Sequence, residues 1–312
     1  MKKRALALVC ALTFGALTLT ACGGSAETPA AAPAETQTAA EGAAAEAGPA
    51  ENAETEAGQT AAEADGTEEK GTVTVAATPV PHAEILEAAK PMMEEKGWTL
   101  EVVEFTDYVQ PNEVVESGDI DANYFQHINY MESYNEEKGT HLVSAGEIHY
   151  EPLGIYPGKE SDLNNISDGA EIAVPNDTTN EGRALLLLQE NGLITLDPEA
   201  GITATVMDIT ENPHNLEIVE LQAEQVARTL PDVAFGVVNG NYALQAGLST
   251  SDAVALETAD SEAIQQYVNV IAVKEGNENK EGIQALVEVL KSDEIRTFIN
   301  DTYQGSVVPY EE

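Results

Sequence analysis

The sequence predicts an α/β protein of two lobes with a cleft between them. Stretches typical of strands and helices alternate from Gly71 onward, a pattern that favours largely parallel sheets with helices on both faces. The 242 residues from that point are more than one hydrophobic core usually serves. Two prolines and a glycine within residues 151–157 are typical of a crossing between lobes. We therefore expect lobe 1 to comprise residues 71–157 and 264–312, and lobe 2 to comprise residues 158–263.

The expected elements follow from apolar patterning along the chain. Residues 72–76 form a short run rich in β-branched side chains, and residues 81–96 place their apolar side chains on one helical stripe. Further strands are expected at residues 100–105, 120–124, 141–145, 171–175, 203–209, 216–221, 233–238 and 267–274. Further helices are expected at residues 112–117, 127–138, 179–191, 223–230, 241–246 and 282–290.

The first 22 residues are typical of a lipoprotein signal. Three basic residues at positions 2–4 precede an apolar and small-residue stretch at 5–18, and Leu19-Thr20-Ala21-Cys22 follows. Cleavage before Cys22 would remove the signal peptide, residues 1–21, and leave Cys22 carrying the lipid anchor. The alternatives are an ordinary secretory signal or a single membrane-spanning helix, although a span needs roughly 20 apolar residues.

A disordered acidic tether is expected to follow, from the lipidated Cys22 to residue 70. Residues 23–70 contain no Val, Ile, Leu, Met, Phe, Tyr or Trp, so they cannot bury enough apolar surface to offset the entropy of ordering. Cys10 lies in the signal and Cys22 would carry lipid. The mature chain therefore has no thiol left for a disulfide, and its stability must come from a packed core.

Composition and motifs exclude several classes of function. The chain carries 14 basic and 55 acidic residues, a net charge of −41, which would repel nucleic acid and anionic lipid headgroups. It contains no GxSxG, HExxH, Walker or GxGxxG motif, so we expect neither an enzyme nor a cofactor. The five histidines show no paired metal-ligand spacing, and we expect no metal site.

Several long motifs resemble those of the NlpA family, the methionine-binding lipoproteins. The first-lobe matches are Glu104-Phe-Thr-Asp-Tyr-Val-Gln-Pro-Asn112, Gly118-Asp-Ile-Asp-Ala-Asn-Tyr-Phe-Gln-His127 and Pro81-His-Ala-Glu-Ile-Leu86. The second-lobe matches are Pro175-Asn-Asp-Thr-Thr-Asn-Glu-Gly-Arg-Ala-Leu185 and Val238-Asn-Gly-Asn-Tyr-Ala243. The resemblance implies a two-lobed, type II-like periplasmic-binding-protein fold. It also implies a monomer, lipid-anchored on the extracytoplasmic face of the cell membrane, that delivers methionine to an ABC permease.

The matched motifs suggest how such a ligand would be held. Arg183 suits the carboxylate, because its planar fork can bind two oxygens at a helix start, and Asn239 offers an amide carbonyl to the ammonium. The thioether needs an apolar, polarizable slot, and the polar end needs one closing group. The aromatic candidates for that slot are Tyr108, Phe125 and Tyr130, and the closing group is His127. We expect Arg183→Ala to weaken binding by several kcal/mol while leaving thermal stability nearly unchanged.

Other interpretations of these residues and of the function stay open at this point. Arg183 could be a surface residue paired with an acid, Asn239 a turn residue, and each aromatic an ordinary core residue. Secondary candidates for ligand contact are Asn123, Tyr124, Asn215 and Asn241. The ligand could be another amino acid or a short peptide, and the chain could instead be a surface adhesion or interaction lipoprotein of the same fold.

Overall fold

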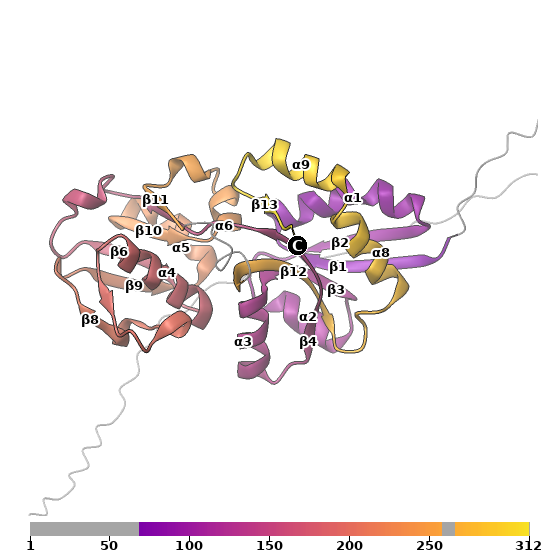
Figure 1. Ribbon diagram of the computed structural model, residues 1–312, viewed down its shortest axis with the longest axis horizontal. Coiled ribbons are helices and arrows are strands. Elements are labelled where there is room, and N and C mark those ends of the chain that lie inside the picture. Colours follow the sequence, from indigo (N-terminus) through magenta and orange to yellow (C-terminus); the bar gives the residue numbers. More distant parts are fainter. Residues whose placement is uncertain (1–68, 258–265, 312) are drawn as a thin grey trace, which may run out of the picture. The chain divides into compact units, whose positions relative to one another are not determined.

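The computed structural model describes residues 69–257 and 266–311 (Figure 1). The expected signal peptide, Cys22 and the tether up to residue 68 lie outside the described residues. Lys70, the last residue of the expected tether, already belongs to the fold, because its backbone N–H donates to Gly97 O at 2.8 Å. Within the described ranges, no helix has the length and apolar character to cross a membrane.

A six-stranded sheet forms the centre of the first lobe. Its strand order is β13-β4-β12-β3-β1-β2, in which β1 is parallel to both β2 and β3, and the other pairs are antiparallel. The strands are β1 (Gly71–Ala77), β2 (Trp98–Glu104), β3 (Ala122–His127), β4 (Leu142–Tyr150), β12 (Val268–Lys274) and β13 (Val308–Pro309). Strand β12 comes from the C-terminal part of the chain, so the first lobe is built from two separate stretches of sequence.

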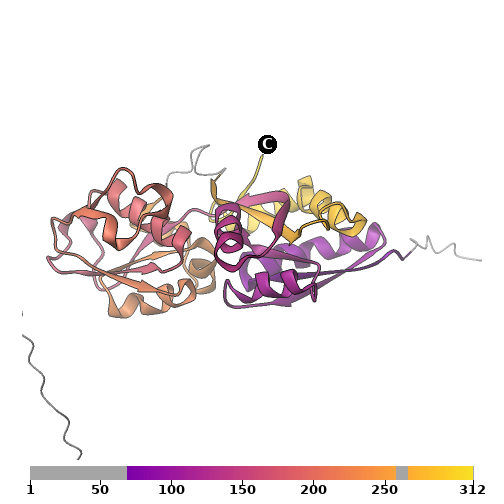
Figure 2. The same ribbon diagram turned by 90° about the horizontal axis from the view of Figure 1, so that it is seen from below.

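Helices cover both faces of this sheet (Figures 1 and 2). One face carries α1 (Glu84–Glu95), α8 (Glu281–Leu290) and α9 (Asp293–Tyr303). The short helical turn η1 (Pro79–Ala83) leads into α1. The opposite face carries α2 (Gln110–Ser117) and α3 (Ile128–Lys138). Alternation along β12 explains the two layers. Ile271 and Val273 belong to the core with α1, α8 and α9, whereas Val270 and Ala272 pack with the residues of α2 and α3.

A five-stranded sheet forms the centre of the second lobe. Its order is β11-β5-β10-β6-β9, and β6 is parallel to β9 and β10. The strands are β5 (Gly154–Pro157), β6 (Glu171–Pro175), β9 (Glu217–Leu221), β10 (Phe235–Val238) and β11 (Ala255–Leu256). Helix α4 (Thr178–Glu190) packs on one face, and α5 (Ala223–Thr229) and α6 (Gly240–Gln245) pack on the other. Smaller elements are the strand pair β7 (Thr195–Leu196) and β8 (Ile209–Glu211), and the turns η2 (Leu163–Asn165), η3 (Gly201–Thr203), η4 (Val206–Asp208), η5 (Leu230–Asp232) and η6 (Thr250–Asp252).

The structure corrects three of the predictions made from the sequence. The expected strand at residues 203–209 is wrong: Thr205 and Asp208 form a capping box that turns the chain into η4, and only β8 is extended. The expected boundary after residue 157 is late, because β5 already pairs with β10 in the second sheet. Helix α9 was not expected, although its N-cap Ser292 accepts from the Ile295 N–H.

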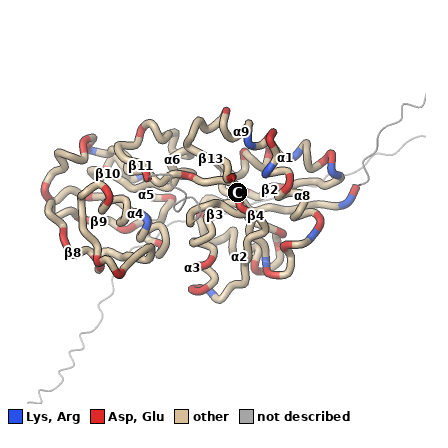
Figure 3. Tube along the Cα trace, in the orientation of Figure 1, with Lys and Arg blue, Asp and Glu red and all other residues tan. Residues whose placement is uncertain are grey.

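Acidic residues occur along both lobes, with few basic residues among them (Figure 3). The interior is different, because most of its buried residues are apolar. Buried polar residues occur mainly where parallel strands of the two sheets end. In open α/β sheets, ligands bind at the carboxyl ends of the parallel strands. This edge is therefore where a functional site is expected.

Candidate functional site

A cavity lies at the carboxyl ends of strands from both sheets. It is lined by Tyr108, Phe125, Gln126, His127, Tyr130, Glu151, Asn180, Arg183, Asn239, Gly240, Asn241 and Asn269. All six ligand-binding candidates from the sequence are in this set. Their contact with a ligand stays a prediction, but the structure brings them to one place.

The aromatic wall comes from the first lobe. Tyr108 follows β2, Phe125 lies in β3, and Tyr130 lies in the first turn of α3. The ring centroids of Tyr108 lie 5.6 Å from Phe125 and 5.7 Å from Tyr130, which are contacts expected of tilted and edge-on pairs. Tyr242 of α6, which the sequence reading missed, packs on Tyr108 at 4.9 Å. Tyr242 therefore supports the wall from the second lobe without lining the cavity.

A chain of hydrogen bonds fixes the orientation of Asn239. The Asp177 carboxylate, which caps α4, can only accept, so Asn180 Nδ2 donates to it at 2.9 Å. Asn180 Oδ1 therefore points away and accepts from Asn239 Nδ2 at 2.7 Å. The remaining atom, Asn239 Oδ1, is buried and has no hydrogen-bond partner among the described residues. It is an unused acceptor in the cavity wall.

The Asn180 amide also fixes the orientation of the ring of His127, the last residue of β3. Tyr130 N–H donates to His127 Nδ1 at 3.1 Å, so the proton of the neutral ring sits on Nε2. His127 Nε2 then donates to Asn180 Oδ1 at 3.2 Å, which joins the first lobe to the second. Burial and, second to it, the charge of the nearby Arg183 lower the pKa of His127 to about 3, so the ring is neutral at physiological pH. His127 acts here as a hydrogen-bond donor without charge.

Arg183 lies one turn after Asn180 on the same face of α4. It is 4% exposed, so the alternative of a surface arginine is wrong. Its Nη2 donates to Glu257 at 2.5 Å and to Glu151 O at 2.9 Å, and its guanidinium lies 4.0 Å from the Tyr267 ring centroid. The hydrogen bonds of Arg183 to described residues use Nε and Nη2 only, so Nη1 is the part of the fork left for a ligand.

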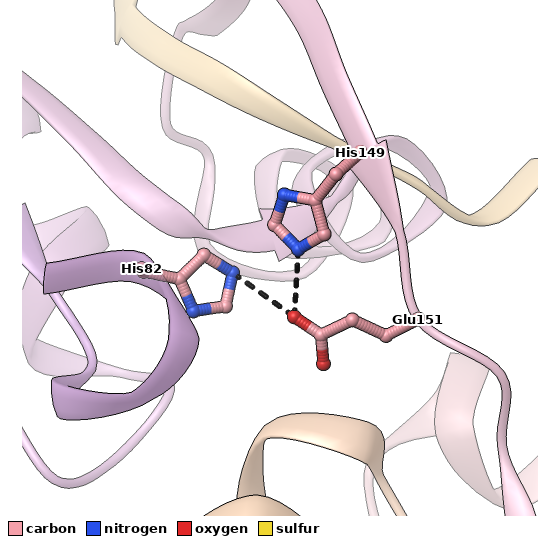
Figure 4. A group of neighbouring side chains, drawn as sticks. All are labelled: His82, His149 and Glu151. Carbon is pink, nitrogen blue, oxygen red and sulfur yellow. Dashed lines mark hydrogen bonds and ion pairs between the residues drawn. The ribbon is translucent and has the colours of Figure 1, made fainter. Parts of the chain in front are cut away.

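A second polar cluster, which was not predicted from the sequence, adjoins the cavity (Figure 4). His82 of η1, His149 of β4 and Glu151 are buried, and one oxygen of Glu151 faces both rings. His149 Nε2 lies 2.8 Å from Glu151 Oε1, and His82 Nε2 lies 3.4 Å from the same oxygen. These residues are far from one another in sequence except for the pair 149 and 151, so no local spacing could have revealed them.

The four secondary candidates for ligand contact lie in different places. Asn241 lines the cavity and accepts from the Tyr108 hydroxyl at 2.5 Å. Asn123 donates to Asn112 Oδ1, and Tyr124 meets the His149 ring, so both lie behind the cavity wall. Asn215 donates to Asp168 on an exposed loop of the second lobe. Only Asn241 is therefore placed for ligand contact.

Known proteins resemble this chain over nearly all of its described residues. The model of the family described as NlpA lipoprotein matches residues 73–311. The methionine-binding lipoprotein MetQ of Bacillus subtilis is 41% identical over 250 residues, covering 78% of this chain and 89% of that relative. The D-methionine-binding lipoprotein MetQ of Escherichia coli K12 is 41% identical over 229 residues, covering 72% and 83%.

Two solved structures share the fold. A putative lipoprotein from Ruminococcus gnavus is 65% identical with a TM-score of 0.76, covering 77% of this chain and 99% of its own. A nutrient binding protein from Burkholderia cenocepacia bound to methionine is 42% identical with a TM-score of 0.73, covering 77% and 100%. These matches confirm the predicted two-lobed binding-protein fold. The chain belongs to the NlpA lipoprotein family.

Proposed function

We propose that this protein is a lipid-anchored solute-binding protein that captures methionine in the cavity and delivers it to an ABC importer. The observation that carries the proposal is the cavity itself: Arg183, the unused acceptor of Asn239 and a wall of aromatic rings face one space. The names of relatives about 40% identical, which bind methionine or D-methionine, support the choice of ligand. The methionine bound to the Burkholderia protein supports it too.

Each part of a methionine zwitterion has a chemical partner in the cavity. The carboxylate would meet Arg183, whose positive charge and remaining N–H groups suit an anion. The ammonium would donate to Asn239 Oδ1, and this contact would satisfy a buried acceptor. The thioether would lie against Tyr108 and Phe125, because sulfur gains about 0.3–1.5 kcal/mol on an aromatic ring. No part of this arrangement activates a nucleophile, so binding alone is the proposed role.

Membrane attachment and the permease complete the proposal. Family membership supports a lipoprotein, and Cys22 is the residue we propose to carry the lipid on the extracytoplasmic face of the membrane. The partner would be an ABC permease with its own ATP-hydrolysing subunits. One solved relative, from Coxiella burnetii and 38% identical, is described as the periplasmic substrate-binding protein of an ABC transporter, which supports this partner.

The experiment is titration calorimetry of the mature chain carrying Cys22→Ser, so that it is not acylated. Any co-purified ligand is first removed by partial unfolding and refolding. We expect saturable binding of one L-methionine per chain, with D-methionine and L-leucine measured alongside to rank the ligands. Absence of saturable binding by every amino acid tested would overturn the proposal and favour a surface interaction role.

A further inference from the structure

Glu151 lies at the point where the chain leaves the first sheet for the second. It follows β4 by one residue and precedes β5, it is 7% exposed, and it lines the cavity with Asn239 and Gly240. One carboxylate oxygen faces His82 and His149, and the other points away from both rings (Figure 4). A Cβ on residue 240 would come within 2.9 Å of that second oxygen, so the glycine keeps space for it.

The two imidazoles beside Glu151 are neutral donors. His149 Nε2 faces the Glu151 carboxylate, which can only accept, so the proton of the neutral ring lies on Nε2 and Nδ1 accepts from the Tyr124 hydroxyl. His82 Nε2 lies between two acceptors, Asn269 Oδ1 at 3.0 Å and Glu151 Oε1 at 3.4 Å, which requires the same tautomer. Burial lowers the pKa of His82 to about 4 and that of His149 to about 3.

The ligand atoms of His82, His149 and Glu151 lie within 4.8 Å of one another, a spacing also compatible with a metal ion. Every ring nitrogen, however, already has a hydrogen-bond partner in the described residues. The cluster is thus a complete hydrogen-bond network, and such networks hold their members in one orientation. Here the member that is held is the Glu151 carboxylate.

Among the described residues, no lysine or arginine side chain forms an ion pair with the Glu151 carboxylate. Within the described residues, its ion-pair contacts are the rings of His82 and His149, which are neutral. Arg183 touches the backbone carbonyl of Glu151, but its ion pair is with Glu257. Burial raises the pKa of Glu151, and His82, the Asn241 N–H that donates to its carboxylate and the charge of Arg183 oppose this rise. A buried carboxylate of this kind is stabilised by any cation that enters the cavity.

We infer that Glu151 is the anionic partner of the ligand's ammonium group and that His82 and His149 are positioning residues that hold its carboxylate toward the cavity. This inference rests on the proposed function and adds to it a rule of specificity. A ligand must carry a protonated amine to compensate Glu151 and to donate to Asn239 Oδ1. Amino acids blocked on nitrogen, or lacking nitrogen, would leave the carboxylate uncompensated and would be rejected.

The first test compares two ligands on the unmodified binding site. L-methionine and 4-(methylthio)butanoate share the carboxylate and the thioether, and they differ in the amine. We expect the mature wild-type chain to bind methionine about 100-fold more tightly, the size of effect seen when one partner of a buried charge pair is removed. Similar affinities for the two ligands would overturn the inference while leaving methionine binding intact. Failure to bind either ligand would overturn the proposed function.

The second test assigns the selectivity to Glu151. Glu151→Gln keeps the shape of the side chain and removes its charge, so we expect it to lose tenfold or more in affinity for methionine, on the order of one lost charged hydrogen bond. Its affinity for 4-(methylthio)butanoate should rise, because this ligand would no longer leave a buried charge uncompensated. The matched control is Glu147→Gln on the same strand β4, a residue outside the cavity lining, which should change neither affinity. An equal loss for both ligands in Glu151→Gln would refute the assignment.

The third test concerns the positioning residues. His149→Phe removes the donor to Glu151, and His149→Gln restores an N–H donor on a side chain of similar reach. We expect the phenylalanine variant to lose selectivity for methionine over the amine-free analogue and the glutamine variant to regain part of it. If both variants keep wild-type selectivity, His149 has only a structural role. The two-ligand comparison on wild-type protein decides the main inference even if neither variant folds.

Discussion

Removing the Arg183 side chain should destabilise the fold, in contrast to the expectation from sequence that stability would hardly change. The ion pair between Arg183 and Glu257 is buried, with side chains 5% and 12% exposed. Taking away one partner leaves a buried charge, which costs about 3–5 kcal/mol. The guanidinium also lies over Tyr267 at 4.0 Å, a contact worth roughly 0.5–2 kcal/mol. Arg183→Met should therefore lose about 4 kcal/mol and lower Tm by about 8–16 °C.

The assay is denaturant unfolding at neutral pH, followed by circular dichroism, with the wild type and two variants compared. In the double variant Arg183→Met with Glu257→Gln, the stranded charge is gone, while an amide oxygen can still accept from the Tyr150 hydroxyl and the Leu153 N–H. We expect the double variant to be about 2 kcal/mol more stable than Arg183→Met alone. Both variants should lose methionine binding, because the cationic fork is absent from each.

Two results would refute this reasoning. One is a free energy of unfolding for Arg183→Met within about 0.5 kcal/mol of the wild type, the range typical of surface changes. The other is a double variant less stable than the single one, which would mean that Glu257 is not stranded. Lower pH offers an internal check. Protonation of Glu257 removes the stranded charge, so the deficit of Arg183→Met should shrink as pH falls.

Three further outcomes are expected. His82 and His149 have folded-state pKa values of about 4 and 3, below the ordinary 6.5, so their contribution to stability is present above pH 6.5 and lost as pH falls toward 4. The loss should be at most about 3 kcal/mol for His82, and His82→Gln should flatten the curve of unfolding free energy against pH between 6.5 and 4. Gly240→Ala should cost about 1–3 kcal/mol in thermal unfolding, because its Cβ would lie 2.8 Å from Glu151 Cβ. Asn239→Ala should weaken methionine binding about tenfold by calorimetry, the worth of one hydrogen bond to a charged group.

The sequence predicted most of the fold because its signals are local. Periodic apolar residues and β-branched runs gave strands and helices close to those observed, and the motifs gave the family, which the comparisons confirm. Errors arose where a local signal was ambiguous. Residues 203–209 are rich in β-branched side chains, yet the capping box of Thr205 and Asp208 outweighs that preference. Strand β5 was missed because Pro152, just before it, and its own Gly154 and Pro157 are typical of a turn.

The cavity was predictable in part. The motifs singled out Arg183, Asn239 and the aromatic residues, which do share one cavity. The partners of Arg183 and of the histidines were not predictable, because nothing local distinguishes Glu257 or Glu151 from the many other acidic residues of the chain. Their roles depend on which carboxylates the fold buries, and burial follows from contacts between distant parts of the chain, such as the pairing of β11, next to Glu257, with β5, which follows Glu151. Buried charge pairs are therefore a property that only the structure reveals.

The distribution of the cavity residues implies how binding would be coupled to the two lobes. The aromatic wall and His127 belong to the first lobe, Arg183 and Asn239 belong to the second, and Glu151 lies at the crossing. A ligand shifts a conformational equilibrium only by the difference between its affinities for the two states. A methionine in this cavity would place its thioether on the aromatic wall of the first lobe and its carboxylate and ammonium on Arg183 and Asn239 of the second, so it makes all of its contacts only when the lobes are together. Its binding free energy would thus favour the closed arrangement, which the bonds from His127 to Asn180 and from Tyr108 to Asn241 already join.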